Sequence, residues 1–165
     1  VEVADLSQTD AQAWCDQNGF QLSKEEDFSD SIAQGGFISQ SPQAGTQIEK
    51  GSTVTVHYSK GKEPTMEDKN ALAKAESYSS MMHMSKAAIY DQLTSSYGEG
   101  FPAESAQYTV DHLVADYKAN ALEKAKDYQT SMNMSRSAIY EQLTSSYGEK
   151  FTAEEAQYAV DHLPQ

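Results

Sequence analysis

Residues 70–113 read NALAKAESYSSMMHMSKAAIYDQLTSSYGEGFPAESAQYTVDHL, and residues 120–163 read NALEKAKDYQTSMNMSRSAIYEQLTSSYGEKFTAEEAQYAVDHL. The two stretches align without a gap, and about 30 of their 44 positions are identical. Such self-similarity is typical of a repeat protein, in which each copy forms one supersecondary unit. A unit this small buries too little surface to be stable alone, so we expect the two copies to pack against each other.

Each copy is predicted to form three helices with a turn before the third. Apolar residues recur at spacings of three and four, which marks one face of a helix. In the first copy these faces are Ala71, Ala75, Tyr78 and Met82, then Ile89, Leu93 and Tyr97, then Ala106, Val110 and Leu113, and the second copy repeats them.

The predicted helix ends carry suitable capping residues. Ser85 and Ser135 are expected to cap the second helix of each copy, and Gly98 and Gly148 are expected to end it. Thr152 lies three residues before a glutamate, which is the pattern of a capping box at the start of the last helix.

The connection between the copies is predicted to be helical. No Gly or Pro occurs from residue 103 to residue 147, so the third helix of the first copy is expected to continue through 114–119 into the second copy as a shared long helix. A break near His112 is the alternative.

The first 61 residues have a different composition and predict an α+β module. Ser7 is expected to cap a short helix that ends near Gly19, and three strand-like runs follow at 20–25, 37–41 and 53–59. The last run, TVTVHYS, alternates apolar and polar residues as a half-buried strand does. The predicted domains are 1–61, a linker at 62–66, a first helical repeat at 67–113 and a second at 114–163.

Composition and charge exclude several classes of function. The net charge of −13 is spread along the chain, repels nucleic-acid phosphates and favours basic partners. The third helix of the first copy carries no Lys or Arg, so we expect no nucleic-acid partner. A single cysteine allows no internal disulfide, and no apolar run approaches the roughly 20 residues that span a membrane.

Catalytic and metal-binding patterns are missing from the sequence. There is no glycine-rich phosphate loop, no paired-cysteine zinc motif and no HExxH motif. Asp111–His112 recurs as Asp161–His162, and we expect both pairs to have a structural role near a helix end. Cys15 lacks a histidine partner and is expected in the core. The prediction is therefore a protein that is not an enzyme and has no cofactor.

Residues 38–61, ISQSPQAGTQIEKGSTVTVHYSKG, resemble a PASTA domain. The pattern consists of a Pro, a Gly-Thr, a Lys-Gly-Ser and an alternating final strand ending in Ser-Lys-Gly. The start of the chain departs from this family, which usually has a Val-Pro pair where Val1-Glu2-Val3 stands here. The resemblance implies contact with peptidoglycan through residues 1–61, and a role as a spacer in the cell wall is the alternative.

The repeats resemble the Ltp family of host cell surface-exposed lipoproteins. The features that carry the resemblance are Met-Ser before the second helix, Ala-Ile-Tyr-x-Gln-Leu-Thr-Ser within it, and Tyr-Gly-x-x-Phe before the third. The resemblance implies a protein on the extracellular face of a Gram-positive cytoplasmic membrane, held by an N-terminal lipid anchor absent from this sequence. It also implies superinfection exclusion, in which a phage tape measure protein is bound and phage DNA is kept from entering.

The candidate partner-binding residues are acids that recur in both repeats and would face a basic, elongated partner. They are Asp91, Glu99, Glu104, Asp111, Glu141, Glu149, Glu154 and Asp161. Tyr90 and Tyr108 are candidate outward-facing anchors. The alternative function is that of a peptidoglycan-associated structural or sensory cell-wall protein.

Overall fold

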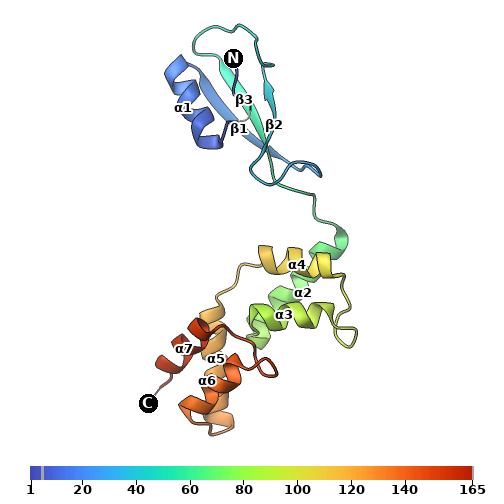
Figure 1. The fold of residues 1–165 in the computed structure, drawn as a ribbon, viewed down its shortest axis with the longest axis vertical. Coiled ribbons are helices and arrows are strands. Elements are labelled where there is room, and N and C mark those ends of the chain that lie inside the picture. The colour runs from blue at the N-terminus through green and yellow to red at the C-terminus, as the bar shows by residue number, and fades with distance from the viewer. Residues whose placement is uncertain (5, 165) are drawn as a thin grey trace. The chain divides into compact units, whose positions relative to one another are not determined.

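The chain forms two compact units, Val1–Glu63 and Pro64–Gln165 (Figure 1). The computed structural model describes residues 1–4 and 6–164. No helix among these residues is both long enough and apolar enough to cross a membrane.

The first unit packs one helix against a three-stranded sheet, as predicted. Helix α1 (Gln8–Asn18) is followed by strands β1 (Gln21–Asp27), β2 (Phe37–Ser41) and β3 (Thr53–Ser59). The strand order is β1-β3-β2, with β1 parallel and β2 antiparallel to β3. The alternation in TVTVHYS buries Val54, Val56 and Tyr58 against Ala11 and Cys15 of α1. Burial also raises the pKa of the Cys15 thiol, as does Asp16 beside it, and both effects keep the thiol protonated and unreactive.

The second unit contains the two repeats, each a bundle of three helices. The first repeat consists of α2 (Met66–Met82), α3 (Lys86–Thr94) and α4 (Ala103–His112), and the second of α5 (Tyr117–Ser131), α6 (Arg136–Thr144) and α7 (Ala153–Asp161). Each repeat has a small core of its own, built by the predicted helix faces. Alanines on α2 and α5 allow the helices to approach closely, and isoleucine and leucine from α3 and α6 fill the space between them.

The helix starts follow the predicted caps. The Ser85 hydroxyl accepts the Ala88 amide at 3.1 Å, and Ser135 does the same for α6. Thr65 with Asp68, and Thr152 with Glu155, form complete capping boxes. Local side-chain chemistry therefore sets where these helices begin.

The shared long helix predicted between the repeats is wrong. Helix α4 ends at His112, residues 113–116 are not helical, and α5 starts anew at Tyr117. The Asp116 carboxylate accepts the Ala119 amide at 3.0 Å and caps the new helix. The break lets Leu113 and Tyr117 both turn onto the core of the first repeat, whereas Val114 between them is almost fully exposed.

Two further helix predictions need correction. Helix α3 ends at Thr94, four residues before Gly98, so Tyr97 lies beyond the helix and is not on its buried face. At the end of α2 the chain turns at His83, which takes a left-handed conformation with φ of 51°. Met84 therefore packs on the core, and the predicted Met82 is exposed.

Candidate binding surfaces of the helical unit

The two repeats are joined by hydrogen bonds from side chains of one copy to side-chain and backbone atoms of the other, and we call this contact the seam. The Asn120 amide donates to the Ser79 hydroxyl at 2.9 Å and to the Met84 carbonyl at 3.0 Å. From the first repeat, the Ser85 hydroxyl donates to the Glu149 carbonyl at 2.6 Å. Asn120 and Ser85 are both buried, so these bonds fix how the two copies lie against each other.

Lys150 adds an ion pair to the seam. Its ammonium group pairs with the Asp91 carboxylate of the first repeat. Lys150 takes a left-handed conformation with φ of 58°, and the equivalent residue of the first copy is Gly100, with φ of 69°. A side chain in this conformation costs about 1 kcal/mol. The ion pair at the seam offsets part of that cost.

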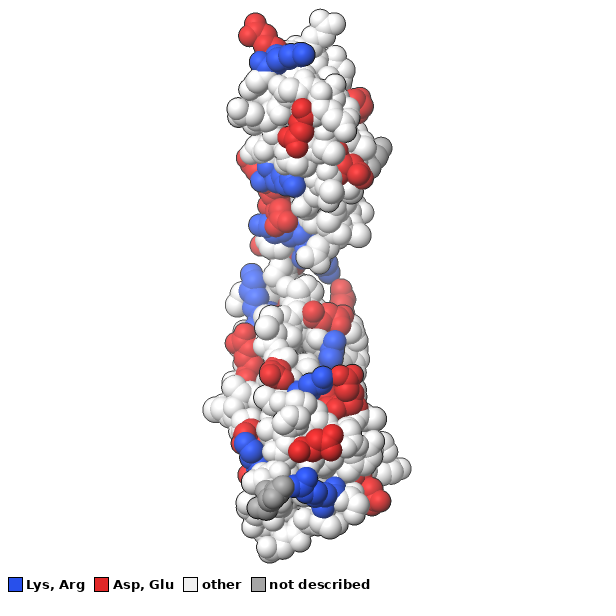
Figure 2. All heavy atoms as spheres, turned by 90° about the vertical axis from the view of Figure 1, so that its left-hand side faces the viewer, with Lys and Arg blue, Asp and Glu red and all other residues white. Residues whose placement is uncertain are grey.

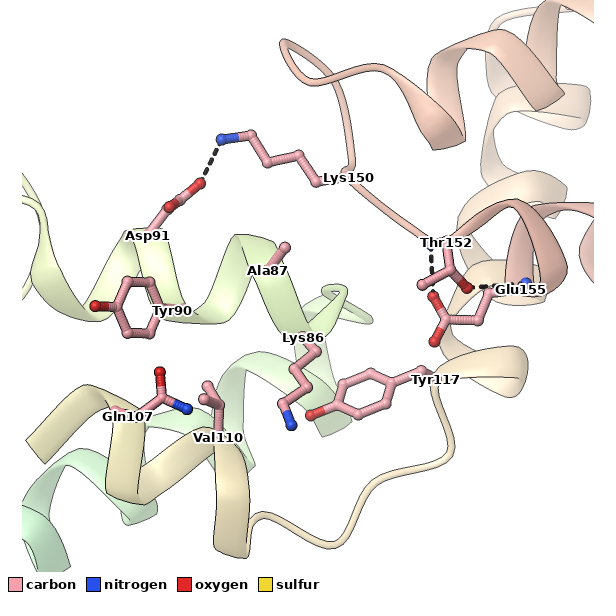
Figure 3. Close-up of a pocket in the computed structure, with 10 residues that line it drawn as sticks. All are labelled: Lys86, Ala87, Tyr90, Asp91, Gln107, Val110, Tyr117, Lys150, Thr152 and Glu155. Carbon is pink, nitrogen blue, oxygen red and sulfur yellow. Dashed lines mark hydrogen bonds and ion pairs between the residues drawn. The ribbon is translucent and has the colours of Figure 1, made fainter. Parts of the chain in front are cut away.

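A cavity of about 430 Å³ opens along the seam (Figure 3). Its walls are the α3 and α4 side chains of the first repeat and residues that reach over from the second. Figure 3 shows Lys150 extending to Asp91 and the Tyr117 ring lying beside Lys86. The Tyr117 hydroxyl is buried and has no hydrogen-bond partner among the described residues. Burial and, less strongly, nearby Glu155 raise the pKa of Tyr117.

Two matched groups of Lys, Tyr and Glu tie the loop after the second helix of each repeat to its first helix. The Tyr78 hydroxyl donates to Glu99 at 2.5 Å, and Lys74 pairs with the same carboxylate at 3.1 Å. Tyr128, Lys124 and Glu149 repeat the arrangement. The bond from Tyr78 is the largest of the causes that lower the pKa of Glu99 and raise that of Tyr78. Burial and the bond to Glu149 raise the pKa of Tyr128 to about 12.

The loops held in this way display the two most exposed aromatic side chains of the unit. Tyr97 and Tyr147 are both fully exposed, at 101% of the reference area. The Tyr97 amide donates to the Ser95 hydroxyl at 3.2 Å, and the second copy repeats this bond. A Cβ atom on Gly98 would lie 2.4 Å from the Gln92 carbonyl, so only glycine lets the turn close this tightly. Both rings are therefore presented on the same fixed turn.

The predicted outward-facing anchors Tyr90 and Tyr108 are only partly exposed. Tyr90 is half-buried and lines the seam cavity, and Tyr108 stacks on His112 with ring centroids 4.0 Å apart. The His112 ring also bonds to the Tyr108 carbonyl at 2.7 Å, and His162 repeats both contacts. The expected structural role of the Asp–His pairs near a helix end is confirmed for the histidines. The fully exposed aromatic pair is Tyr97 and Tyr147.

Most of the candidate acids have partners within the chain. Glu99 and Glu149 hold the loops, Asp91 pairs with Lys150, Asp111 with Lys86 at 3.5 Å, and Glu154 with Lys118 at 2.6 Å. Asp161 accepts a bond from Gln157 at 2.9 Å, and Glu104 lies exposed in the first turn of α4.

Glu141 differs from these acids. It is exposed on α6, and no bond or ion pair to its carboxylate occurs within the described residues. Figure 2 shows acids interspersed with Lys and Arg on the face in view, without one continuous acidic patch there. Among the described residues, no group of three or more His, Cys, Asp or Glu side chains is arranged to hold a metal ion.

The sequence did not lead us to predict that Lys150 and Asn120 join the repeats, or that Tyr97 and Tyr147 are exposed. One signal for the seam was present, because Lys150 stands where the other copy has Gly100 within a nearly identical stretch. Asn120 offered none, because the first copy has the same residue at the matching position, Asn70.

Comparison with protein families identifies both parts of the chain. The model of the family described as host cell surface-exposed lipoprotein matches residues 66–113 and again 116–163. These matches cover more than half of the chain, and the chain belongs to this family. A PASTA domain model matches residues 2–60. Both families are binding or structural modules, and the first places the chain among cell-surface proteins.

Two solved structures are similar to the chain. Ltp, a superinfection exclusion protein from the Streptococcus thermophilus temperate phage TP-J34, is 41% identical, with a TM-score of 0.57, over 62% of this chain and 100% of that one. The extracellular region of the Ser/Thr kinase PrkC from Staphylococcus aureus is 37% identical over 39% of this chain and 24% of that one, with a TM-score of 0.34. No curated protein matches the chain.

Proposed function

We propose that this protein is a surface lipoprotein that binds a phage protein, the tape measure protein, and so keeps phage DNA from entering the cell. The helical unit is 41% identical to a superinfection exclusion protein along that protein's whole length. The PASTA domain would hold the molecule in the peptidoglycan, near the path that incoming DNA takes. A lipid anchor at the N-terminal side would keep it at the outer face of the cytoplasmic membrane.

The observation that carries the proposal is the matched display of Tyr97 and Tyr147. Large exposed aromatic side chains on rigid turns are typical anchors of protein interfaces, because they bury much area and lose little entropy. Two equal anchors held at a fixed spacing suit an elongated partner with a repeated surface, since the second contact gains from effective concentration.

The candidate acids have a secondary place in this proposal. Asp111, Glu154 and Asp161 stay exposed even though each has a partner within the chain. Their negative charge attracts a basic partner and so speeds its association. Glu99 and Glu149 act indirectly, by holding the tyrosine-bearing loops.

The test is a double substitution, Tyr97→Ala with Tyr147→Ala, in protein displayed on host cells that are challenged with phage. Both side chains are fully exposed, so stability should change by less than about 0.5 kcal/mol. We expect normal phage adsorption and loss of the block to DNA injection. The control is Tyr90→Ala, which alters a half-buried tyrosine of the seam cavity.

The alternative function is that of a structural or sensory cell-wall protein, and it rests on the PASTA match over residues 2–60. In that case peptidoglycan fragments bind the first unit and the helical repeats serve as a scaffold. Titration of the whole chain with muropeptides, followed by the fluorescence of Trp14, tests it directly. Binding with no effect on phage would favour this alternative.

A further inference from the structure

The same groove occurs twice in the helical unit, once in each repeat. In the first repeat it lies between α3 and α4 and is part of the seam cavity of about 430 Å³. In the second it lies between α6 and α7 and measures about 410 Å³. The residues that line the second groove are Arg136, Ser137, Tyr140, Glu141, Gln157, Val160 and Asp161. Each of the first six matches a lining residue of the first groove, 50 positions earlier in the sequence.

The first groove shows what such a groove accepts. Tyr117 from the second repeat packs on the core of the first repeat, which includes Val110, and both residues line the cavity. Lys150 crosses from the same repeat and pairs with Asp91 on the groove wall. The occupant therefore supplies one aromatic ring and one ammonium group.

Within the described residues, the second groove is lined by the second repeat alone. Glu141 occupies the position of Asp91, and its carboxylate has no partner there. The Arg136 guanidinium donates to the Val160 carbonyl at 2.9 Å and to the Leu163 carbonyl at 3.0 Å. These bonds hold the end of α7 in place, so the groove is formed before any partner arrives.

A second copy of this chain is a poor occupant. The residues of the first repeat that match Tyr117 and Lys150 are Glu67 and Gly100. A second copy docked in the manner of the seam would set Gly100 toward Glu141, which leaves that carboxylate without a cation. It would also set Glu67 where the ring of Tyr117 stands in the first groove, and a carboxylate on an apolar wall is unfavourable. The groove therefore favours a different chain.

We propose that the groove between α6 and α7 is a docking site for a partner protein segment that places a Lys or Arg against Glu141 and an aromatic side chain against Tyr140 and Val160. The partner would imitate what the second repeat places into the groove of the first. This inference rests on the proposed function for its premise that the partner is a protein. It adds a defined site, distinct from the tyrosine turns, and the chemistry of the bound segment.

The first test is the charge reversal Glu141→Lys in protein displayed on cells that are challenged with phage. Asp127→Lys is the matched control, because Asp127 is an exposed acid of α5 that does not line the groove. Reversing the charge that faces the partner's cation should weaken binding about tenfold or more. We expect the block to DNA injection to fail with Glu141→Lys and to persist with Asp127→Lys. If Glu141→Lys still blocked DNA injection fully, the docking site in the groove would be refuted, and the proposed function would still stand.

The second test needs no phage and uses the purified full chain. A synthetic helical peptide with one Lys and one Tyr four residues apart is titrated while amide signals are followed by NMR. Shifts at Tyr140 and Val160 that vanish in Glu141→Lys support the docking site, even if the wild-type protein gives no protection. No shift at these residues overturns it. Dimers that form through this groove and dissociate in Glu141→Lys would assign it to a second copy and also overturn the proposal.

Discussion

Replacing Asn120 by alanine should weaken the helical unit by breaking the seam. The Asn120 amide makes two hydrogen bonds across it, at 2.9 and 3.0 Å, and the residue is only 7% exposed. Each bond contributes about 1 kcal/mol net, and the buried Ser79 hydroxyl and Met84 carbonyl would lose a donor. We therefore expect a loss of about 2 kcal/mol.

Asn70→Ala is the matched control for this change. Asn70 lies at the equivalent place in α2 of the first repeat, where it is exposed. Alanine is a better helix former than asparagine at both positions, so comparing the two variants removes that difference. Asn70→Ala should change stability by less than about 0.5 kcal/mol.

Urea unfolding followed by circular dichroism at 222 nm measures both variants. The unfolding midpoint of the helical signal should fall by about 1–2 M in Asn120→Ala and hardly move in Asn70→Ala. Trp14, the single tryptophan, lies in the first unit and reports the folding of that unit separately. Equal midpoints for the two variants would show that the seam bonds contribute nothing, and would refute the rigid pairing of the repeats.

Two more predictions concern the loops. Gly98→Ala should lower the free energy of unfolding by about 2 kcal/mol, because the added Cβ would lie 2.4 Å from the Gln92 carbonyl. Gly100→Ala meets no atom within 4 Å and should lower it by only about 1 kcal/mol, through backbone strain. Thermal unfolding measures both variants. The pKa of Tyr128 is raised from 10.0 to about 12, so the stability that its neutral hydroxyl provides is complete below pH 10 and is lost as the pH rises from 10 to 12. Between those pH values the wild type should lose about 1–2 kcal/mol more than Tyr128→Phe in urea titrations, and equal losses would contradict the assignment.

The sequence predicted best what local chemistry controls. Ser85 and Thr152 lie at helix starts because a hydroxyl satisfies a free backbone amide a few residues away. The alternation of Val54 and Val56 follows from the pleat of a strand. The repeat itself fixed the number and order of the helices. These features depend on residues within one turn or one strand.

Features set by distant contacts escaped prediction. The break near His112 was only the alternative to a continuous helix, because helix continuity competed with a cap at Asp116 and with packing of Tyr117 on the first core. The bond from Ser85 to Glu149 spans 64 residues and leaves no local pattern. The exposure of Tyr97 depends on a turn that closes only because Gly98 approaches Gln92 so closely.

The most direct test of the central proposal is the passage of phage DNA into cells that display the protein on their surface. Adsorption and DNA injection are scored separately for the wild type and for the double variant Tyr97→Ala with Tyr147→Ala. The proposal predicts normal adsorption in both, blocked injection with the wild type, and restored injection with the double variant. Unhindered injection with the wild type across a broad panel of phages, or an undiminished block with the folded double variant, would contradict it.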